Sequence, residues 1–244
     1  MQEITILSPH RDDAAFSLCM ALRRWSAMRV KLTVINFFTV SAYGPGSSAK
    51  DPATISNIRQ REDRRVISMI GPLIRIRDAG LLDAPLRLGI EAAAVCRPET
   101  RSFLKTKDLQ DVSCFIRRWA HSGLLIAPLS LGGHIDHIAV YEAAMESAAS
   151  PRLAYFEDLP YAAWTSDQTL MARVANAEQK TKTSLRPAVI RTRFTGPTKR
   201  RIIARYQSQI AREESAFIAR FSARYGGGER LWIPKRARNW IAIT

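Results

Sequence analysis

The chain of 244 residues has few cysteines, no long apolar run and too few acidic residues to balance its basic ones. Its three cysteines, Cys19, Cys96 and Cys114, are too few and too scattered for a disulfide framework or a thiolate metal site. No apolar segment reaches the roughly 20 residues that a membrane-spanning helix needs. The N-terminus carries an acidic residue and leads directly into a strand-like stretch, which is not typical of a secretory signal. We therefore expect a cytoplasmic protein.

The shortage of acidic residues is concentrated at one end of the chain. Overall, 37 Lys and Arg face 22 Asp and Glu, a formal net charge of +15. From Arg186 to Thr244 there are 14 basic and three acidic residues, so this part carries 14 − 3 = +11 and residues 1–185 carry 15 − 11 = +4. A basic segment of this kind suits nucleic acid, anionic lipid headgroups or an anionic substrate. A solvated arginine-rich surface explains it equally well, because 29 of the 37 basic residues are Arg.

The hydrophobic pattern of the first 40 residues predicts a strand, a helix and a second strand. Residues Glu3–Ser8 form a short apolar run that stops at Pro9, and Lys31–Val40 is β-branched and aromatic. Between them, residues 13–28 have apolar side chains at helical spacing. A strand–helix–strand unit of this length indicates a parallel sheet with a right-handed crossover.

The rest of the chain continues the same alternation. Gly, Pro and Ser predict a loop over 41–56, followed by a helix from about Asn57 to Ile70, where Gly71-Pro72 ends it. Further predicted elements are helices over 109–120 (with Asp108 as cap), 135–148 and 202–221, and strands over 124–128 and 153–156. The expected fold is a Rossmann-like α/β domain, a mostly parallel sheet flanked by helices. One domain spans 1–244, with an α/β core over 1–185 and a basic helical and loop extension over 186–244.

Two polar clusters follow predicted strands, where open α/β sheets bind their ligands. Pro9-His10-Arg11-Asp12-Asp13 comes directly after the first strand, and Gly132-Gly133-His134-Ile135-Asp136-His137 lies between the 124–128 strand and the next helix. Three of the four histidines of the chain fall in these two segments. This concentration is the strongest functional signal in the sequence.

The residue types in these clusters favour a metal site over a nucleotide site. A phosphate-binding turn needs glycine so that phosphate can approach the backbone, and none occurs from Pro9 to Met28. Two histidines and one carboxylate, with open positions for water, are the usual ligands of catalytic zinc. A purely structural interpretation is that Asp12, Asp13 or Asp136 caps a helix, but two such clusters at neighbouring strand ends make it the less favoured one.

The paired motifs Pro9-His10-Arg11-Asp12-Asp13 and His134-Ile135-Asp136-His137 resemble those of the LmbE-like (PIG-L) N-deacetylases. These zinc enzymes remove acetyl groups from N-acetylglucosamine-type sugars. Less specific similarities are Arg59-Gln-Arg-Glu62, Asp78-Ala-Gly-Leu81, Tyr155-Phe-Glu-Asp-Leu-Pro-Tyr161, Tyr206-Gln-Ser-Gln209 and Glu229-Arg-Leu-Trp232.

The resemblance implies a role for each matching residue. One Zn²⁺ per chain would be held by His10, Asp13 and His137. Asp12 would be the general base and would later carry a proton towards the leaving amine. A protonated His134 would stabilise or protonate the tetrahedral intermediate, with Asp136 orienting it. Arg59 and Asp78 would contact substrate hydroxyls.

The chain departs from the family pattern at two positions. Some family members have Tyr where this chain has Gly132. Either another donor, for example from the 41–56 loop, would serve at the oxyanion, or zinc and His134 alone would hold it. Arg11 replaces a small or apolar residue, and it either favours an anionic substrate or pairs with a nearby acid; we favour pairing, the usual state of arginine.

The expected partner is an N-acetylated amino sugar, and an anionic or lipid-linked acceptor, peripheral membrane contact and the oligomeric state stay open. Two alternatives are a metal-dependent amidohydrolase that acts on a non-sugar acyl amide, and a nucleic-acid-binding protein that uses the basic C-terminal part. The second would need exposed aromatic side chains such as Tyr206, Trp232 and Trp240 for base stacking. We do not expect nucleic-acid binding, because Tyr206 lies in an apolar stripe.

Overall fold

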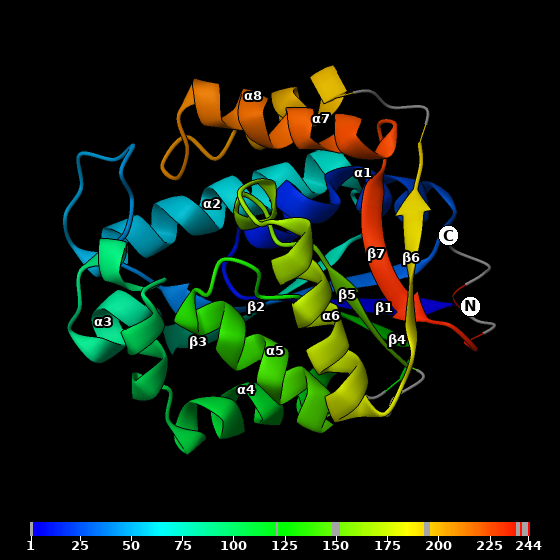
Figure 1. Cartoon of the computed structure of the whole chain (residues 1–244). Coiled ribbons are helices and arrows are strands. Elements are labelled where there is room, and N and C mark those ends of the chain that lie inside the picture. The colour runs from blue at the N-terminus through cyan, green and yellow to red at the C-terminus, as the bar shows by residue number, and fades with distance from the viewer. Residues whose placement is uncertain (1, 121, 148–151, 193–195, 238–239, 241–243) are drawn as a thin grey trace.

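The protein is built on one seven-stranded sheet that lies between two layers of helices (Figure 1). The computed structural model describes residues 2–120, 122–147, 152–192, 196–237, 240 and 244. Its strands are β1 (Glu3–Ser8), β2 (Lys31–Val40), β3 (Arg75–Leu82), β4 (Leu124–Pro128), β5 (Leu153–Phe156), β6 (Leu185–Ile190) and β7 (Glu229–Pro234). They lie in the order β3-β2-β1-β4-β5-β7-β6. The predicted α/β class is confirmed.

Strands β1 to β5 are parallel to one another, β7 runs against them, and β6, which is antiparallel to β7, runs in the same direction as β1 to β5. β2 and β4 each pair with β1 in parallel, whereas β7 pairs antiparallel with both β5 and β6. The strand that follows β1 in the chain, β2, therefore lies on one side of it, and β4 lies on the other side. This reversal creates a crevice beyond the carboxyl ends of β1 and β4, which is where open α/β sheets bind ligands.

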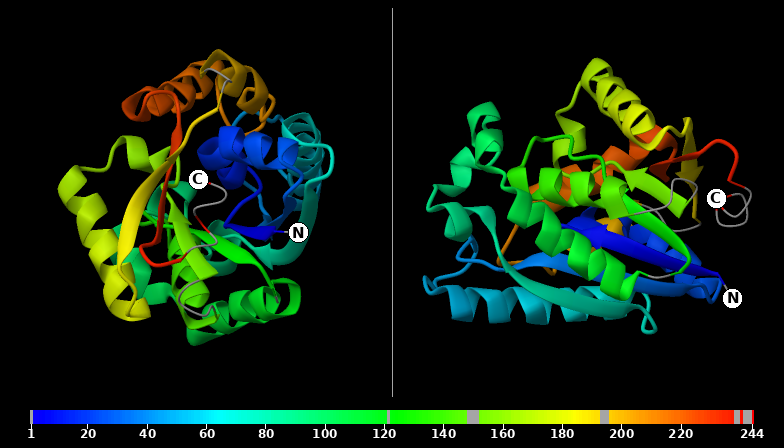
Figure 2. Two further views of the ribbon diagram at one scale, coloured as in Figure 1. Left: turned by 90° about the vertical axis from the view of Figure 1, so that its right-hand side faces the viewer. Right: turned by 90° about the horizontal axis from the view of Figure 1, so that it is seen from below.

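Helices cover both faces of the sheet, as the two views of Figure 2 show together with Figure 1. On one side α1 and α2 pack against each other and against α7, and α7 packs against α8; on the other side α4 packs against α5 and α5 against α6. The helices are α1 (Asp13–Ala27), α2 (Pro52–Ile70), α3 (Ala84–Leu88), α4 (Thr106–Trp119), α5 (Ile135–Ser147), α6 (Asp167–Thr181), α7 (Gly196–Ile203) and α8 (Arg212–Phe221).

The predictions for helix boundaries were partly wrong because side-chain caps were misplaced. Helix α2 begins at Pro52, inside the predicted loop, where the Asp51 carboxylate accepts the Thr54 N–H at 2.8 Å. Helix α4 begins at Thr106, and Asp108 is not its cap but lies in its first turn, where it accepts the Lys105 N–H at 3.0 Å. The two helices therefore begin five and three residues earlier than predicted, at 52 instead of 57 and at 106 instead of 109.

The single helix predicted over 202–221 is wrong, since residues 204–211 separate α7 from α8. The interruption places Tyr206 in the interior, where its hydroxyl donates to Asp63 Oδ1 at 2.9 Å. The same segment brings the Ser208 N–H to Glu62 Oε1 at 2.9 Å. These tertiary contacts with α2 outweigh the helical periodicity of the segment.

The part of the chain after Arg186 is not only an extension, because it adds two strands to the sheet. β6 and β7 pair over six residues, and β7 joins them to β5 through Tyr155 and Phe156. Strand β6 was not predicted because Pro187 interrupts its pattern. Strand β3 was not predicted because it alternates between exposed and half-buried residues without an apolar run. Both are edge strands, where such patterns are tolerated.

A buried ion pair attaches this C-terminal part to α1. Lys199 of α7 donates to Glu229 Oε1 at 2.7 Å, and both side chains are almost fully buried. The other oxygen of Glu229 accepts the backbone N–H groups of Met20 and Ala21 at 3.0 and 2.9 Å. Helix α1 is interrupted at Leu18 (φ −126°, ψ 18°), so Glu229 serves amides next to this break.

A second buried group, Asp63 on α2, gives a prediction about pH. Burial raises its pKa to about 7, although hydrogen bonds from Tyr206 and Asn36 favour the charged form. The pKa of an unfolded aspartate is about 3.9. The native protein therefore binds more protons than the unfolded chain between these values, and this residue makes stability fall as pH rises through that window.

We expect Asp63→Asn to remove this pH dependence. Its amide can accept from Asn36 and donate to Tyr206, whose hydroxyl then donates to the Arg11 carbonyl oxygen that already lies 3.1 Å away. As pH rises from about 4 to 8, the free energy of unfolding of the variant should increase relative to that of the wild type, by at most ~4 kcal/mol for three pKa units. Urea unfolding at several pH values measures this, and parallel curves for the two proteins would refute it.

Candidate metal and catalytic site

The two motifs meet in the crevice between β1 and β4. His10 lies in the turn after β1, Asp12 and Asp13 begin α1, and His134 and His137 lie at the start of α5 after β4. Neither aspartate is used as a helix cap: the Asp12 side chain makes no capping hydrogen bond, and Asp13 accepts from the His10 N–H at 2.7 Å. The structural interpretation of these residues as caps therefore fails.

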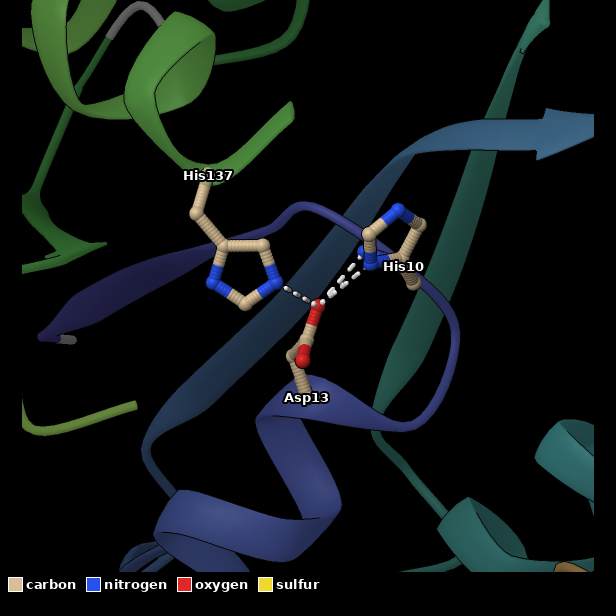
Figure 3. Close-up of side chains that lie close together, drawn as sticks. All are labelled: His10, Asp13 and His137. Carbon is tan, nitrogen blue, oxygen red and sulfur yellow. Dashed lines mark hydrogen bonds and ion pairs between the residues drawn. The ribbon is translucent and has the colours of Figure 1, made fainter. Parts of the chain in front are cut away.

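His10, Asp13 and His137 form a buried three-residue cluster around one carboxylate oxygen (Figure 3). Asp13 Oδ2 lies 3.2 Å from His10 Nδ1 and 3.3 Å from His137 Nε2. The three ligand atoms lie within 4.8 Å of one another. Two imidazoles and one carboxylate that converge in this way leave open coordination positions, as catalytic metal sites do.

The remaining nitrogen of each ring contacts a second carboxylate. His10 Nε2 lies 3.1 Å from Asp136 Oδ2, and His137 Nδ1 lies 2.9 Å from Asp158 Oδ2. Asp136 also accepts from Arg87 and from the Ala84 N–H, and Asp158 accepts the Leu131 N–H. Carboxylates in these positions fix the tautomer of a ligating histidine and raise its basicity.

Two details of this outer layer differ from the expectations. The Asp136 carboxylate contacts His10 and not His134; it is the Asp136 backbone N–H that donates to His134 Nδ1, at 3.2 Å. Asp158 was given no role from the sequence. It follows β5, and applying the strand-end rule to that strand as well would have pointed to it.

The charges of the cluster suit a cation. Burial would lower the pKa of His10, but the hydrogen bonds that its ring donates to Asp13 and Asp136 raise it to about 9. Burial likewise opposes protonation of His137, yet Asp13 and Asp158 raise its pKa well above the usual value. His137 and His10 hold the pKa of Asp13 far below its ordinary value against the effect of burial. A divalent ion at these atoms would take the place of the ring protons, since ligating imidazoles are neutral. The donor set therefore fits a divalent metal.

Asp12 lies beside the cluster with a different environment. Burial, with the adjacent Asp13 carboxylate, raises the pKa of Asp12, although Arg59 opposes this. The guanidinium of Arg59 lies 3.5 Å from Asp12 Oδ1 and also donates to Ser41 Oγ. Two adjacent carboxylates with opposite pKa shifts are the pattern expected for one ligand and one proton carrier.

The surroundings of His134 favour a neutral imidazole, whereas a protonated one was expected. Burial lowers its pKa well below the usual value, and the positive charge of His10 lowers it further. Since Nδ1 accepts the Asp136 N–H, the ring proton is on Nε2. His134 therefore presents a neutral N–H donor to the cavity.

Arg11 and Asp78 pair with each other and not with the cavity. Arg11 donates to Asp78 Oδ2 at 3.1 Å and to the Thr39 carbonyl oxygen at 2.6 Å. Asp78 also accepts from Gln60 and Asn36. Neither residue lines the cavity, so the expected contacts with substrate are not supported for them, whereas the favoured pairing of Arg11 with an acid is observed.

The cavity over the cluster measures about 600 Å³. Its walls include His10, Asp12, Asp13, His134, Arg59, Tyr43, Cys96, Tyr161, Gln209 and Glu214. Tyr161 takes the space beside Gly132: a Cβ at that position would lie 2.1 Å from Tyr161 Cδ1. Tyr43 comes from the 41–56 loop, where a replacement donor was sought, and Tyr161 is a second candidate that sequence reasoning missed.

Comparison with known proteins gives the family of the chain. Residues 5–148 match the family model PIG-L, described as GlcNAc-PI de-N-acetylase, and the chain belongs to this family. A curated relative from Streptomyces fradiae, 2'-N-acetylparomamine deacetylase, is 29% identical over 160 residues, which cover 64% of this chain and 57% of that protein. The match thus spans little more than half of the relative.

Solved structures show the same fold at lower sequence identity. A deacetylase of the teicoplanin biosynthesis pathway, in its bog complex, superposes with a TM-score of 0.66 at 22% identity, covering 95% of this chain and 97% of that one. N,N'-diacetylchitobiose deacetylase from Pyrococcus horikoshii gives a TM-score of 0.63 at 18% identity, with 96% and 84% covered. A zinc-inhibited form of teicoplanin deacetylase gives 0.65 at 22%, with 95% and 97% covered.

Proposed function

We propose that the protein is a metal-dependent hydrolase that removes the acetyl group from an N-acetylglucosamine-type sugar. The observation that carries this proposal is the convergence of His10, Asp13 and His137 beside a separate carboxylate, Asp12, in one cavity. Family membership and the names of the similar proteins supply the amide and sugar chemistry. The proposed metal is Zn²⁺, one per chain.

Each residue of the site has its own role in amide hydrolysis. A divalent ion held by His10, Asp13 and His137 would polarise the acetamide carbonyl and acidify water. Asp12 accepts the proton of the attacking water and delivers it to the sugar nitrogen as the C–N bond breaks, because an amine leaves only when protonated. The N–H of His134 donates to the developing oxyanion.

The neighbouring side chains keep these groups in place. Arg59 fixes Asp12 through the contact at 3.5 Å, and Asp136 and Asp158 orient His10 and His137. Tyr43 and Tyr161 are hydroxyl-bearing walls of the cavity, available to contact the carbonyl oxygen or sugar hydroxyls. Arg59 is then a positioning residue more than a substrate contact.

Acetate release tests the proposal directly. We expect the purified protein to liberate acetate from at least one N-acetylglucosaminyl glycoside, lipid or nucleotide, and to lose this activity when a chelator removes the metal. Adding about one equivalent of Zn²⁺ per chain should restore it, with metal content measured by mass spectrometry. Acetate release that survives complete metal removal would refute the metal-dependent reaction. Activity on simple acyl amides but on no sugar would assign the site to a non-sugar amidohydrolase.

Tyr206, Trp232 and Trp240 are buried, so none of these three rings is exposed for base stacking. Among the described residues, no helix is long and apolar enough to cross a membrane. A cytoplasmic location is part of the proposal, and no contact with a membrane surface is assumed.

A further inference from the structure

A groove between α7 and α8 has about twice the volume of the cavity over the metal-ligand cluster. It measures about 1200 Å³. Five arginines line it: Arg200, Arg201, Arg205, Arg212 and Arg220. Figure 1 shows α7 and α8 side by side on the α1–α2 face of the molecule. The groove therefore gathers much of the basic charge that the sequence concentrates after Arg186.

Other exposed arginines, such as Arg65 and Arg117, are also unpaired in the described part of the chain; these five are distinguished by lining one groove together. Within the described ranges, none of the five guanidinium groups makes a hydrogen bond or ion pair, and no acidic side chain lines the groove. Elsewhere six arginines pair with carboxylates, namely Arg11, Arg59, Arg87, Arg101, Arg224 and Arg230. Five unpaired cations around one concave surface create a strongly positive potential that attracts an anion.

The groove adjoins the catalytic cavity across the segment between α7 and α8. Ile210 lines both spaces, while the preceding Gln209 lines the cavity and Gln207 lines the groove. On α8, Glu214 borders the cavity and the next residue, Ser215, borders the groove. A ligand with its acetamide at the metal-ligand cluster can thus continue past Ile210 into the arginine-lined space.

We propose that this groove is an anion subsite that binds a phosphate group of the substrate, so that the enzyme acts on a phosphate-bearing N-acetylglucosaminyl compound. The proposal rests on the proposed deacetylase function. Arginine forks bind phosphate through two parallel hydrogen bonds, which suits the exposed, unpaired guanidinium groups here. The described lining contains no aromatic side chain, which disfavours single-stranded nucleic acid as the occupant.

The test compares two charge-matched double variants. R201Q/R205Q removes two cations from the groove, whereas R117Q/R118Q removes two from α4, on the other face of the sheet (Figure 1). All four side chains are exposed. The substrates are methyl N-acetylglucosaminide, UDP-N-acetylglucosamine and an N-acetylglucosaminyl phospholipid in micelles, which separate a neutral sugar from two sources of phosphate.

We expect the wild type and R117Q/R118Q to favour at least one phosphate-bearing substrate over the methyl glycoside by tenfold or more in kcat/KM. R201Q/R205Q should lose this preference and keep its activity on the neutral glycoside within twofold. Added salt should reduce the preference in the wild type, because it screens exposed charges. A wild type without a preference, or a preference that survives in R201Q/R205Q, would overturn the proposal.

Binding separates this proposal from the deacetylase function. If no substrate releases acetate, titration calorimetry measures the binding of UDP and of micelles of an anionic phospholipid to each protein. Binding weakened tenfold in R201Q/R205Q, but unchanged in R117Q/R118Q, would support the phosphate subsite; equal binding by both variants would overturn it. Groove-dependent binding of a single-stranded oligonucleotide, with neither phosphate probe bound, would also overturn it.

Discussion

Replacing Asp12 with Asn should lower kcat for acetate release by ~10²–10⁴-fold, the usual contribution of a general base. The substitution retains the shape of the side chain and removes its ability to take a proton. His10, Asp13 and His137 are untouched, so the variant should still bind about one metal per chain. The Arg59 contact at 3.5 Å becomes a hydrogen bond to a neutral oxygen, which leaves the cavity wall in place.

The matched control is Asp13→Asn, which makes the same carboxylate-to-amide replacement at the neighbouring residue. Asp13 Oδ2 is the atom shared by both histidines of the cluster. Asp13→Asn should lose metal as well as activity, and excess Zn²⁺ should restore part of that activity. Excess Zn²⁺ should restore no activity to Asp12→Asn. If Asp12→Asn retains wild-type kcat, Asp12 is not the base. If it loses metal, Asp12 is a ligand and the assignment of the two aspartates is reversed.

Replacing Glu229 with Ala should destabilise the protein by ~3–5 kcal/mol, the cost of leaving a buried charge without its partner. The change leaves the ammonium group of Lys199, which is 1% exposed, without the carboxylate 2.7 Å away. It also removes the acceptor of the Met20 and Ala21 amides beside the break in α1. Since a domain is stable by only ~5–15 kcal/mol, soluble yield should fall as well.

Urea unfolding measures the loss as a shift of the midpoint at constant slope. Two further variants separate the contributions. Glu229→Gln keeps an acceptor for the amides and should lose less than Glu229→Ala. The double variant K199M/E229A removes the buried charge and should recover part of the loss. A loss below about 1 kcal/mol in Glu229→Ala would contradict a stabilising role of this contact.

The sequence alone placed the centre of the site because it depends on local patterns. The apolar runs of β1 and β4 and the helical periodicity of α1 predict a parallel sheet, and parallel strands bring their carboxyl ends to one edge. Residues that directly follow such strands lie at this edge, and they meet where the strands are neighbours, as β1 and β4 are. The residues of this kind are His10, Asp12, Asp13, His134 and His137. The family resemblance rests on the same two motifs.

The tertiary structure decided which side chain contacts which, and the reason is distance along the chain. Asp136 and His10 are 126 residues apart and Lys199 and Glu229 are 30 apart, and no local periodicity encodes such pairs. The division of the 202–221 helix follows from the burial of Tyr206 against Asp63, a contact that competes with local propensity and wins. That division also forms the arginine-lined groove beside the cavity. The sequence by itself therefore determined the amount of basic charge, and only the packing of α7 against α8 decided that part of this charge lines a groove next to the cavity over the metal-ligand cluster.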